Sequence, residues 1–447
     1  MTQLDELFEQ IGKFVLKQAD FTFMRAQTIV KQHTEKLSQI GDIAFPITVQ
    51  PWLNAIETNS AESRNDLKQI INESETEFAR KLCEASTEWM FHIEMVKFSE
   101  FRCLLFLNRP KCYSDFLKTV LYDDASYGQW HHHNTNDDNT NYAVEVVKQS
   151  NDNSLVAHRL QLITKVLINL LRSSGFEANA AKFDVNSLEN NNLTEVLVKS
   201  ARRDGGKRAN RQSELELNNN ANRKSITIIC GNVTICRPGL TADDFIRLRS
   251  LEMEKTAELK HGHNKENVII DKCQKLGAAT VTFDFLKIKH FNTINFEKSM
   301  TTPSTIKGAA FILYNVARLQ TLLASFDHQV ARGFYDPLPK FDQIDFGLLK
   351  EEEEWQMFFV YIVGYPNLLE RCISGIGTGN IAIHLLCTFL SNLSALFSVY
   401  YHRVKILTDN LPQLVPVLYA RIYLLKALRS IFLKALAILE IESLDQM

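Results

Sequence analysis

The sequence lacks several features that would assign it quickly to a class of protein. None of its eight cysteines forms a Cys-x-x-Cys pair, and they are scattered over a chain of 447 residues. This long spacing argues against a disulfide framework and favours reduced thiols. The cysteines are Cys83, Cys103, Cys112, Cys230, Cys236, Cys273, Cys372 and Cys387.

Long apolar runs and a strong net charge are also missing. No run approaches the roughly 20 residues of a membrane span, and the nearest, residues 381–401, is interrupted by polar side chains. The first residues, MTQLDELFEQ, are acidic and do not match a signal peptide. Because the net charge is −2, a basic surface for nucleic acid must be local. We expect a cytoplasmic protein that binds neither membrane nor DNA.

One stretch is locally basic. Residues 184–224 are rich in asparagine and other polar residues, which predicts a linker. From Arg202 to Lys224 this linker holds seven Lys and Arg against three acidic residues. A basic strap on phosphates and a solvated linker without a binding role both fit this composition.

A run of histidines raises the question of a metal site. His131, His132 and His133 stand beside Asp137 and Asp138 in HHHNTNDDNTN. Nothing else nearby has the spacing of metal ligands, and asparagine-rich tracts are typical of solvated loops. We therefore predict a loop here, with no metal and no cofactor.

Hydrophobic periodicity divides the chain into a mixed part and a helical part. Residues 89–109 predict strands, residues 154–177 predict a helix that Gly175 ends, and residues 279–290 predict another strand. From Pro303 on, four or five long helices with apolar faces predict a bundle.

Four consecutive glutamates, Glu351–Glu354, open one of the helices in this bundle. The helix dipole favours acidic residues in a first turn. We therefore assign the run no functional role.

The helical part resembles a known family. From about residue 277 to 447 the chain is similar to the anticodon-binding domain of arginyl-tRNA synthetases, the DALR domain. Four stretches carry the resemblance in the order of that family: GAATVTFDFLK (277–287), YNVARLQTLL (314–323), FSVYYHRVKIL (397–407) and the tail that ends at Met447. The resemblance implies a helical domain that grips an anticodon stem-loop.

These motifs place aromatic and basic side chains on shared helix faces. Tyr314 and Arg318 stand one turn apart. Such faces suit bases stacked on aromatic or guanidinium planes and phosphates held by basic groups. Alternatively, Tyr314 packs in the bundle, Arg318 pairs with an acidic neighbour, and the other residues form solvated amphipathic faces. The candidate tRNA-binding residues are Tyr314, Arg318, Tyr400, Tyr401, Arg403, Lys405, Tyr419, Tyr423, Lys426, Lys434 and Met447.

Two ATP-binding signatures of a synthetase are not recognisable. His158 stands where a His-x-Gly-His turn would end, but Leu155 replaces the first His and Ala157 replaces the Gly. Residues 229–250, in the position of the second signature, contain no lysine to neutralise pyrophosphate. No Gly-rich turn for a methyl donor follows a strand either. We therefore predict no catalytic residues and no enzymatic activity.

This combination resembles the family of DALR anticodon-binding domain-containing protein 3, a synthetase-like paralogue without synthetase signatures. The resemblance implies a non-catalytic adaptor that binds arginine tRNAs and delivers them to a methyltransferase that makes 3-methylcytidine in the anticodon loop. Two alternatives remain open: a divergent arginyl-tRNA synthetase, and a protein-interaction scaffold without RNA binding.

The expected fold class is α+β, with a degenerate Rossmann-like α/β N-terminal half followed by an all-α DALR-type helical bundle. The expected domains are a degenerate synthetase-like region (1–183), the Asn-rich and basic linker (184–224), a remnant of the catalytic core with a connector (225–302) and the DALR bundle (303–447).

Overall fold

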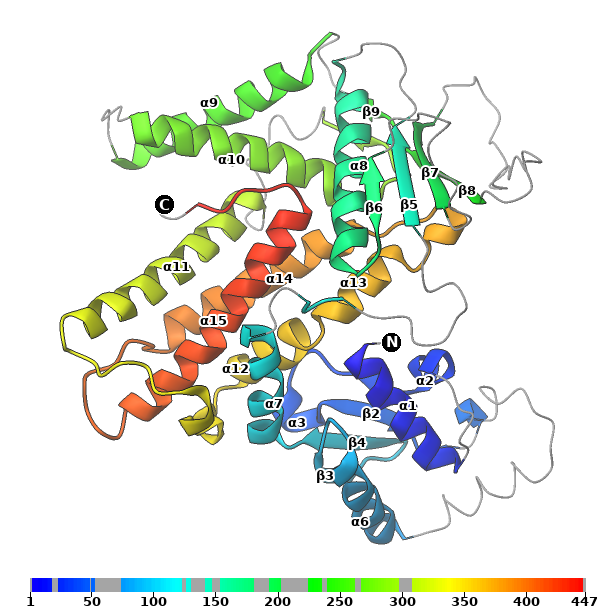
Figure 1. The fold of residues 1–447 in the computed structure, drawn as a ribbon, viewed down its shortest axis with the longest axis vertical. Helices are drawn as coiled ribbons and strands as arrows, with labels where there is room; N and C mark the ends of the chain where they lie inside the picture. The colour runs from blue at the N-terminus through cyan, green and yellow to red at the C-terminus, as the bar shows by residue number, and fades with distance from the viewer. Residues whose placement is uncertain are drawn as a thin grey trace. The chain divides into compact units, whose positions relative to one another are not determined.

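A computed structural model describes most of the chain, and the described residues fall into two compact units (Figure 1). Unit 1 comprises Met1–Tyr127, Asp327–Asn367 and Tyr400–Leu428, and unit 2 comprises Gly128–Phe326, Leu368–Val399 and Arg429–Met447. The described residues are 2–17, 23–48, 50–52, 74–122, 126–129, 141–146, 153–180, 193–201, 224–234, 239–261, 267–296 and 308–444. The histidine run at 131–133, linker residues 202–223 and Met447 lie outside them.

Unit 1 contains an antiparallel sheet with the strand order β1-β2-β4-β3. Its strands are β1 (Lys31–Gln32), β2 (Ile43–Pro46), β3 (Ile93–Phe98) and β4 (Arg102–Leu107). Phe45 of β2 and Phe98 of β3 lie on one face because both pair with Cys103 of β4, and directly paired residues point to the same face of a sheet. Both rings contact Phe78, with centroids 6.4 and 6.1 Å away. Strands β3 and β4 confirm the strands predicted over 89–109.

Helices cover this sheet and extend unit 1 into the C-terminal part of the chain. The elements of this unit are α1 (Gln3–Leu16), α2 (Phe23–Ile29), α3 (Leu37–Ile40), α6 (Glu75–Ala85), η1 (Ser86–Glu88), α7 (Arg109–Tyr122), η2 (Phe341–Gln343), η3 (Phe346–Leu348), α12 (Glu352–Gln356) and the π-helical η4 (Met357–Ile362). The indole N–H of Trp355 donates to Asp42 at 2.6 Å, and the Tyr127 hydroxyl donates to the Ile362 carbonyl at 2.7 Å. The N-terminal sheet and residues 352–362 therefore share one core.

Unit 2 contains a parallel sheet with the strand order β6-β5-β7-β8. Its strands are β5 (Asn141–Val146), β6 (Ala178–Ala180), β7 (Leu193–Ser200) and β8 (Lys224–Cys230). Helix α8 (Leu155–Ser173) joins β5 to the parallel strand β6, which makes the βαβ unit of Rossmann-like folds. Gly175 follows the end of α8 with φ +97°, as predicted for a residue that ends a helix.

The remaining elements of unit 2 are helical, apart from a short parallel pair. They are β9 (Val233–Thr234), α9 (Ala242–His261), α10 (Asn267–Leu286), β10 (Ile294–Asn295) and η5 (Ile376–Thr378). Four more helices contribute residues to both units: α11 (Ala309–Ala331), α13 (Tyr365–Ile373), α14 (His384–Arg403) and α15 (Val415–Ile438). They confirm the helices predicted after Pro303.

Two local predictions are wrong. Residues 279–286 continue helix α10 and form no strand, and Gly277 allows α10 to approach α9 closely, since a Cβ there would lie 2.6 Å from the backbone nitrogen of Ser250. The predicted linker 184–224 contains strand β7, whose Val196 and Val198 are fully buried. In both places packing between elements decides the structure more than local pattern does.

Among the described residues, helix α11, and not residues 381–401, is long and apolar enough to cross a membrane by length and composition alone. Of its most apolar stretch, 56% is buried inside the structure. A core helix of a soluble protein passes the same test, so this property assigns no location.

Asp42 provides a test of the joint core of unit 1. Burial raises the pKa of its carboxyl from 3.8 to about 6. A raised folded-state pKa gives stability that is full below pH 4 and is lost as the pH rises through 6. We expect the free energy of unfolding to fall by about 1 to 2 kcal/mol between pH 5 and 7, and this fall to be absent in Asp42→Asn. Urea unfolding at each pH measures it, with Asp342→Asn as the exposed control.

Candidate nucleic-acid interface

Tyr314 and Arg318 lie against each other on α11, in unit 2. The Arg318 guanidinium lies over the Tyr314 ring, 4.5 Å from its centroid, and donates a hydrogen bond to the Tyr314 hydroxyl. Tyr314 is 43% exposed, so it does not pack inside the bundle. The spacing therefore brings the two residues together as predicted, and they present a planar cationic and aromatic surface.

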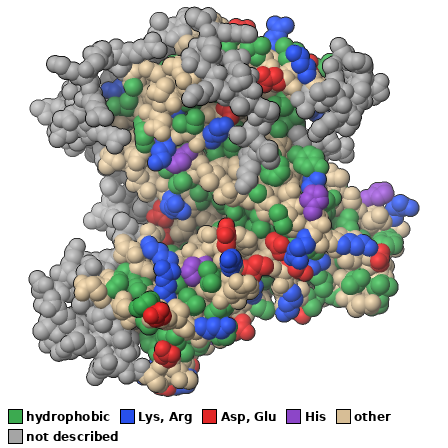
Figure 2. Space-filling model, turned by 180° about the vertical axis from the view of Figure 1, so that it is seen from behind, with side chains coloured by type: hydrophobic (Ala, Val, Ile, Leu, Met, Phe, Trp, Pro, Cys, Tyr) green, Lys and Arg blue, Asp and Glu red, His purple; other side chains and the backbone are tan. Residues whose placement is uncertain are grey.

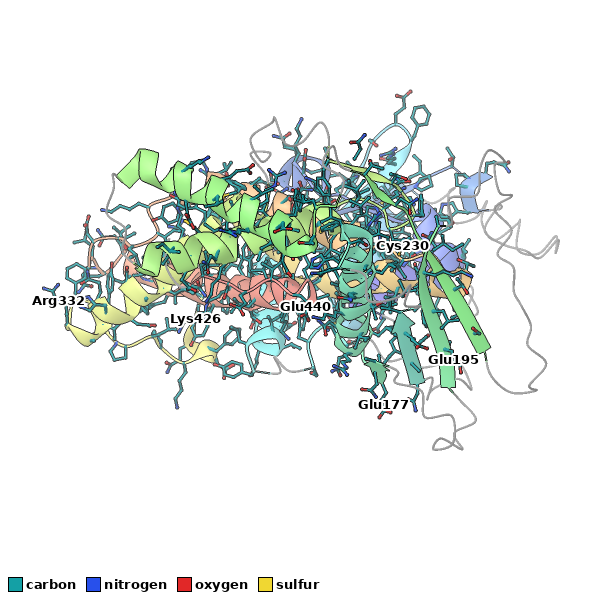
Figure 3. The ribbon with its side chains drawn as sticks, turned by 90° about the horizontal axis from the view of Figure 1, so that it is seen from above. Glu177, Glu195, Cys230, Arg332, Lys426 and Glu440 are labelled. Carbon is teal, nitrogen blue, oxygen red and sulfur yellow. The ribbon has the colours of Figure 1, made fainter. Side chains whose placement is uncertain are left out.

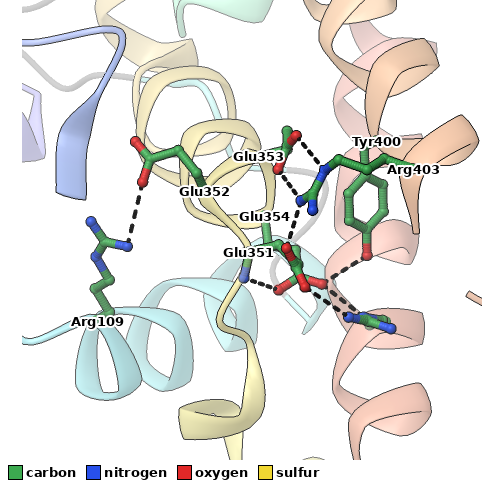
Figure 4. Close-up of polar contacts among 8 residues, drawn as sticks. Arg109, Glu351, Glu352, Glu353, Glu354, Tyr400 and Arg403 are labelled. Carbon is green, nitrogen blue, oxygen red and sulfur yellow. Dashed lines mark hydrogen bonds and ion pairs between the residues drawn. The ribbon is translucent and has the colours of Figure 1, made fainter. Parts of the chain in front are cut away.

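Glu354 is a fully buried carboxylate that connects three helices of unit 1 (Figure 4). One of its oxygens accepts from the Tyr400 hydroxyl at 2.8 Å and from Arg421 Nε at 2.7 Å. The other accepts from the Glu351 N–H at 3.0 Å, which caps α12. Burial raises the pKa of Tyr400 well above its ordinary value.

Arg403 lies at the edge of the same network (Figure 4). Its guanidinium contacts Glu351 at 2.5 Å and both oxygens of Glu353 at 2.9 and 2.5 Å. Burial alone would raise the pKa of Glu353, but hydrogen bonds and charge from Arg403 outweigh it and lower the pKa. The run Glu351–Glu354 therefore holds helices together, a role that the helix-dipole interpretation missed.

This network decides what Tyr400 and Arg403 can offer to a ligand. The Tyr400 ring is fully buried, so in this conformation it presents no face on which a base could stack. Arg403 is 48% exposed, but two carboxylates already balance its charge. Nearby, Lys405 is 69% exposed and contacts Asp409 at 3.3 Å, while Tyr401 is half-buried.

The two predicted tyrosines of α15 also point into the protein. Tyr419 and Tyr423 are each 8% exposed, and their hydroxyls donate to the carbonyls of Asp336 at 3.2 Å and Pro339 at 2.6 Å. They fasten the segment after α11 onto α15. Lys426, labelled in Figure 3, is half-buried and forms no ion pair with another described residue. Lys434 is likewise half-buried on α15.

The formal charges of the two units have opposite signs. Unit 1 contains 28 acidic and 21 basic residues, a net charge of −7, and unit 2 contains 24 acidic and 29 basic residues, a net charge of +5. These values add up to the −2 of the whole chain. On the face seen in Figure 2, Lys and Arg nevertheless stand close to Asp and Glu. Tyr314 and Arg318 belong to the basic unit.

His158 lies in the first turn of α8, which is the helix that follows the first strand of the parallel sheet, β5. Its ring lies 5.7 Å from the Phe285 ring of α10, and burial lowers its pKa. The following residue, Arg159, is 1% exposed, and its guanidinium donates to backbone carbonyls. The sequence gives no sign of this, because an arginine near a helix start usually lies at the surface.

The Glu354 network yields a prediction for unit 1. Glu354→Gln leaves the 11%-exposed Arg421 with only the more distant carboxylate of Glu351, 3.9 Å away, so we expect the free energy of unfolding to fall by about 3 kcal/mol. Urea unfolding near pH 7 measures this change. Glu84→Gln, which removes an exposed partner of Arg80, serves as the control and leaves stability nearly unchanged. An equally small effect at Glu354 would contradict its structural role.

The sequence of the chain is similar to known proteins over its C-terminal part and over about half of its length. Residues 312–447 match the family model "DALR anticodon binding domain". The chain is 31% identical over 230 residues to "DALR anticodon-binding domain-containing protein 3" of Danio rerio, covering 49% of this chain and 41% of that protein. It is 32% identical over 239 residues to the protein of the same name from Mus musculus, covering 52% and 44%. The match thus spans less than half of the length of these relatives.

The solved structures extend the comparison to the fold. The arginyl-tRNA synthetase of Thermus thermophilus has a TM-score of 0.61 and 9% identity, with 99% of this chain and 100% of that chain covered. This likeness shows an arginyl-tRNA synthetase-like fold, in agreement with the predicted fold class. The resemblance to the family of DALR anticodon-binding domain-containing protein 3 is confirmed over about half of the chain, and residues 312–447 match the DALR anticodon binding domain.

Proposed function

We propose that this chain is a non-catalytic tRNA-binding adaptor. It recognises arginine tRNAs through the DALR bundle and supports formation of 3-methylcytidine in the anticodon loop by a partner methyltransferase. The match of residues 312–447 to an anticodon binding domain supports the RNA partner. The arginine tRNA, the methyltransferase and a cytoplasmic location follow from the family resemblance.

The exposed pair of Tyr314 and Arg318 is the observation that carries the RNA-binding part of this proposal. Tyr314 is 43% exposed although the Arg318 guanidinium lies over its ring. The ring therefore offers a surface on which an unstacked base can pack. The guanidinium provides a positive charge for a phosphate at the same place. The pair lies within the matched DALR segment and in the unit with net positive charge.

The sequence at the start of α8 supports the absence of catalysis. The first turn of this helix has Leu155 and Ala157 in place of the His and Gly of an ATP-binding signature.

Substitutions on α11 test the RNA interface. Tyr314→Ala removes a stacking platform, so we expect arginine-tRNA binding to weaken by about 5- to 100-fold with the salt dependence nearly unchanged. Arg318→Ala should weaken binding and lower the salt slope by about one unit. Filter binding at several salt concentrations measures both effects.

Matched controls separate this interface from general effects on the fold. Tyr122→Ala removes a 66%-exposed tyrosine of unit 1, and Arg80→Ala removes an exposed arginine of α6. Both controls should bind tRNA like the unmodified chain. Unchanged binding by the two α11 variants would favour the scaffold without RNA binding. Arg403→Glu is a poor probe because it also breaks the pairs with Glu351 and Glu353.

Two further measurements test the adaptor role. We expect no arginine-dependent exchange between ATP and pyrophosphate, because the ATP signatures are missing. Exchange above background would instead favour a divergent arginyl-tRNA synthetase. Purification of the tagged chain from cells should recover arginine tRNAs and a methyltransferase together, and depletion of the chain should lower 3-methylcytidine in those tRNAs. Recovery of tRNA without a methyltransferase would support tRNA binding by this chain but contradict the adaptor role.

A further inference from the structure

The carboxyl end of β8, an edge strand of the parallel sheet in unit 2, is covered by the chain's own backbone. Strand β8 ends at Cys230, which is fully buried and labelled in Figure 3. The next residue, Gly231, donates its N–H to the His290 carbonyl at 2.8 Å. A Cβ on Gly231 would lie 2.3 Å from the Asn292 carbonyl oxygen. Only glycine allows this approach, so residues 289–293 lie directly on the end of β8.

Arg159 reaches this closure from α8. One of its terminal nitrogens donates to the carbonyls of Gly231 at 2.7 Å and Asn292 at 2.8 Å, and the other donates to Lys289 at 3.2 Å. The three acceptors therefore come from the two backbone segments that meet at the end of β8. None of the ion pairs among the described residues gives this guanidinium a carboxylate partner.

A second buried side chain fixes the outer side of the same segment. The His290 ring contacts the Ile381 carbonyl at 2.9 Å and is 6% exposed. Residues 289–292 are thus held by Arg159 on one side and by the segment before α14 on the other. The two contacts together hold this segment against the end of β8.

We propose that Arg159 occupies a guanidinium-binding site made of three carbonyls, and that this self-occupied site closes the carboxyl end of β8. The chain's own cation fills the place that a free guanidinium ion would take. This inference does not depend on tRNA binding.

Chemical rescue tests the site directly. Arg159→Ala removes hydrogen bonds to three backbone carbonyls, of which only that of Lys289 keeps a second donor, the Asn292 N–H. We therefore expect the midpoint of thermal unfolding to fall by about 5 °C or more. Addition of about 20 mM guanidinium chloride should restore about half of that loss, because a free guanidinium ion binds the folded state at the vacated site. Sodium chloride at equal ionic strength should restore none of it.

Two variants serve as controls for the rescue. Arg159→Met fills the space without donors, so guanidinium should not stabilise it. Arg172→Ala removes an exposed arginine of the same helix that also donates to a carbonyl, at 2.7 Å, and guanidinium should not stabilise it either. Equal behaviour of Arg159→Ala and Arg159→Met with guanidinium would overturn the proposal, even if tRNA binding remained intact.

The unmodified chain provides a test that does not require a folded variant. A site that Arg159 already fills predicts no change in the unfolding midpoint of the unmodified chain with about 20 mM guanidinium chloride. A rise as large as that in Arg159→Ala would show that the site is vacant, and it would overturn the proposal. Loss of tRNA binding in the α11 variants is measured separately, so the two proposals fail independently.

Discussion

One buried carboxylate organises unit 1. Glu354 has no exposed surface, yet it is paired with Arg421 at 2.7 Å and accepts a hydrogen bond from Tyr400. A buried charge is tolerated when it is paired and its remaining hydrogen-bonding positions are filled. The start of α12, the end of α14 and α15 are therefore held in one arrangement around a single side chain. Trp355, the next residue, binds Asp42 and connects this point to the N-terminal sheet.

Contacts within the protein also decide which aromatic and basic residues of the bundle remain available to a ligand. Tyr400 and Arg403 belong to the network, and the hydroxyls of Tyr419 and Tyr423 fasten a neighbouring segment. Their spacing on the helices is that of an RNA-binding face. However, the three tyrosines are buried, and Arg403 is paired with Glu351 and Glu353. Tyr314 differs because its partner, Arg318, lies on the same helix. The Tyr314 ring is not held by a distant element through its hydroxyl, and it keeps an exposed surface that can meet a ligand.

The sequence predicts those features that neighbouring residues determine. The cap at Gly175, the strands within 89–109 and the helices after Pro303 all depend on local pattern, and the structure confirms them. The failures depend on distant contacts. Residues 279–286 alternate like a strand, but their packing against α9 makes them helical, and β7 is a strand because β5 and β8 pair with it on both sides. No local rule distinguishes a tyrosine that bonds to a distant glutamate from one that faces solvent.

Arg421 and Arg159 differ in the groups that their guanidinium ions face. Arg421 faces a carboxylate, whose full charge offsets the loss of water. Arg159 faces carbonyl dipoles alone, and burial lowers its pKa. An apolar side chain would avoid that desolvation, but it would remove the donor that the Gly231 and Asn292 carbonyls share. The buried guanidinium therefore supports the close approach of residues 289–293 to the end of β8, because it donates hydrogen bonds to carbonyls on both backbone segments.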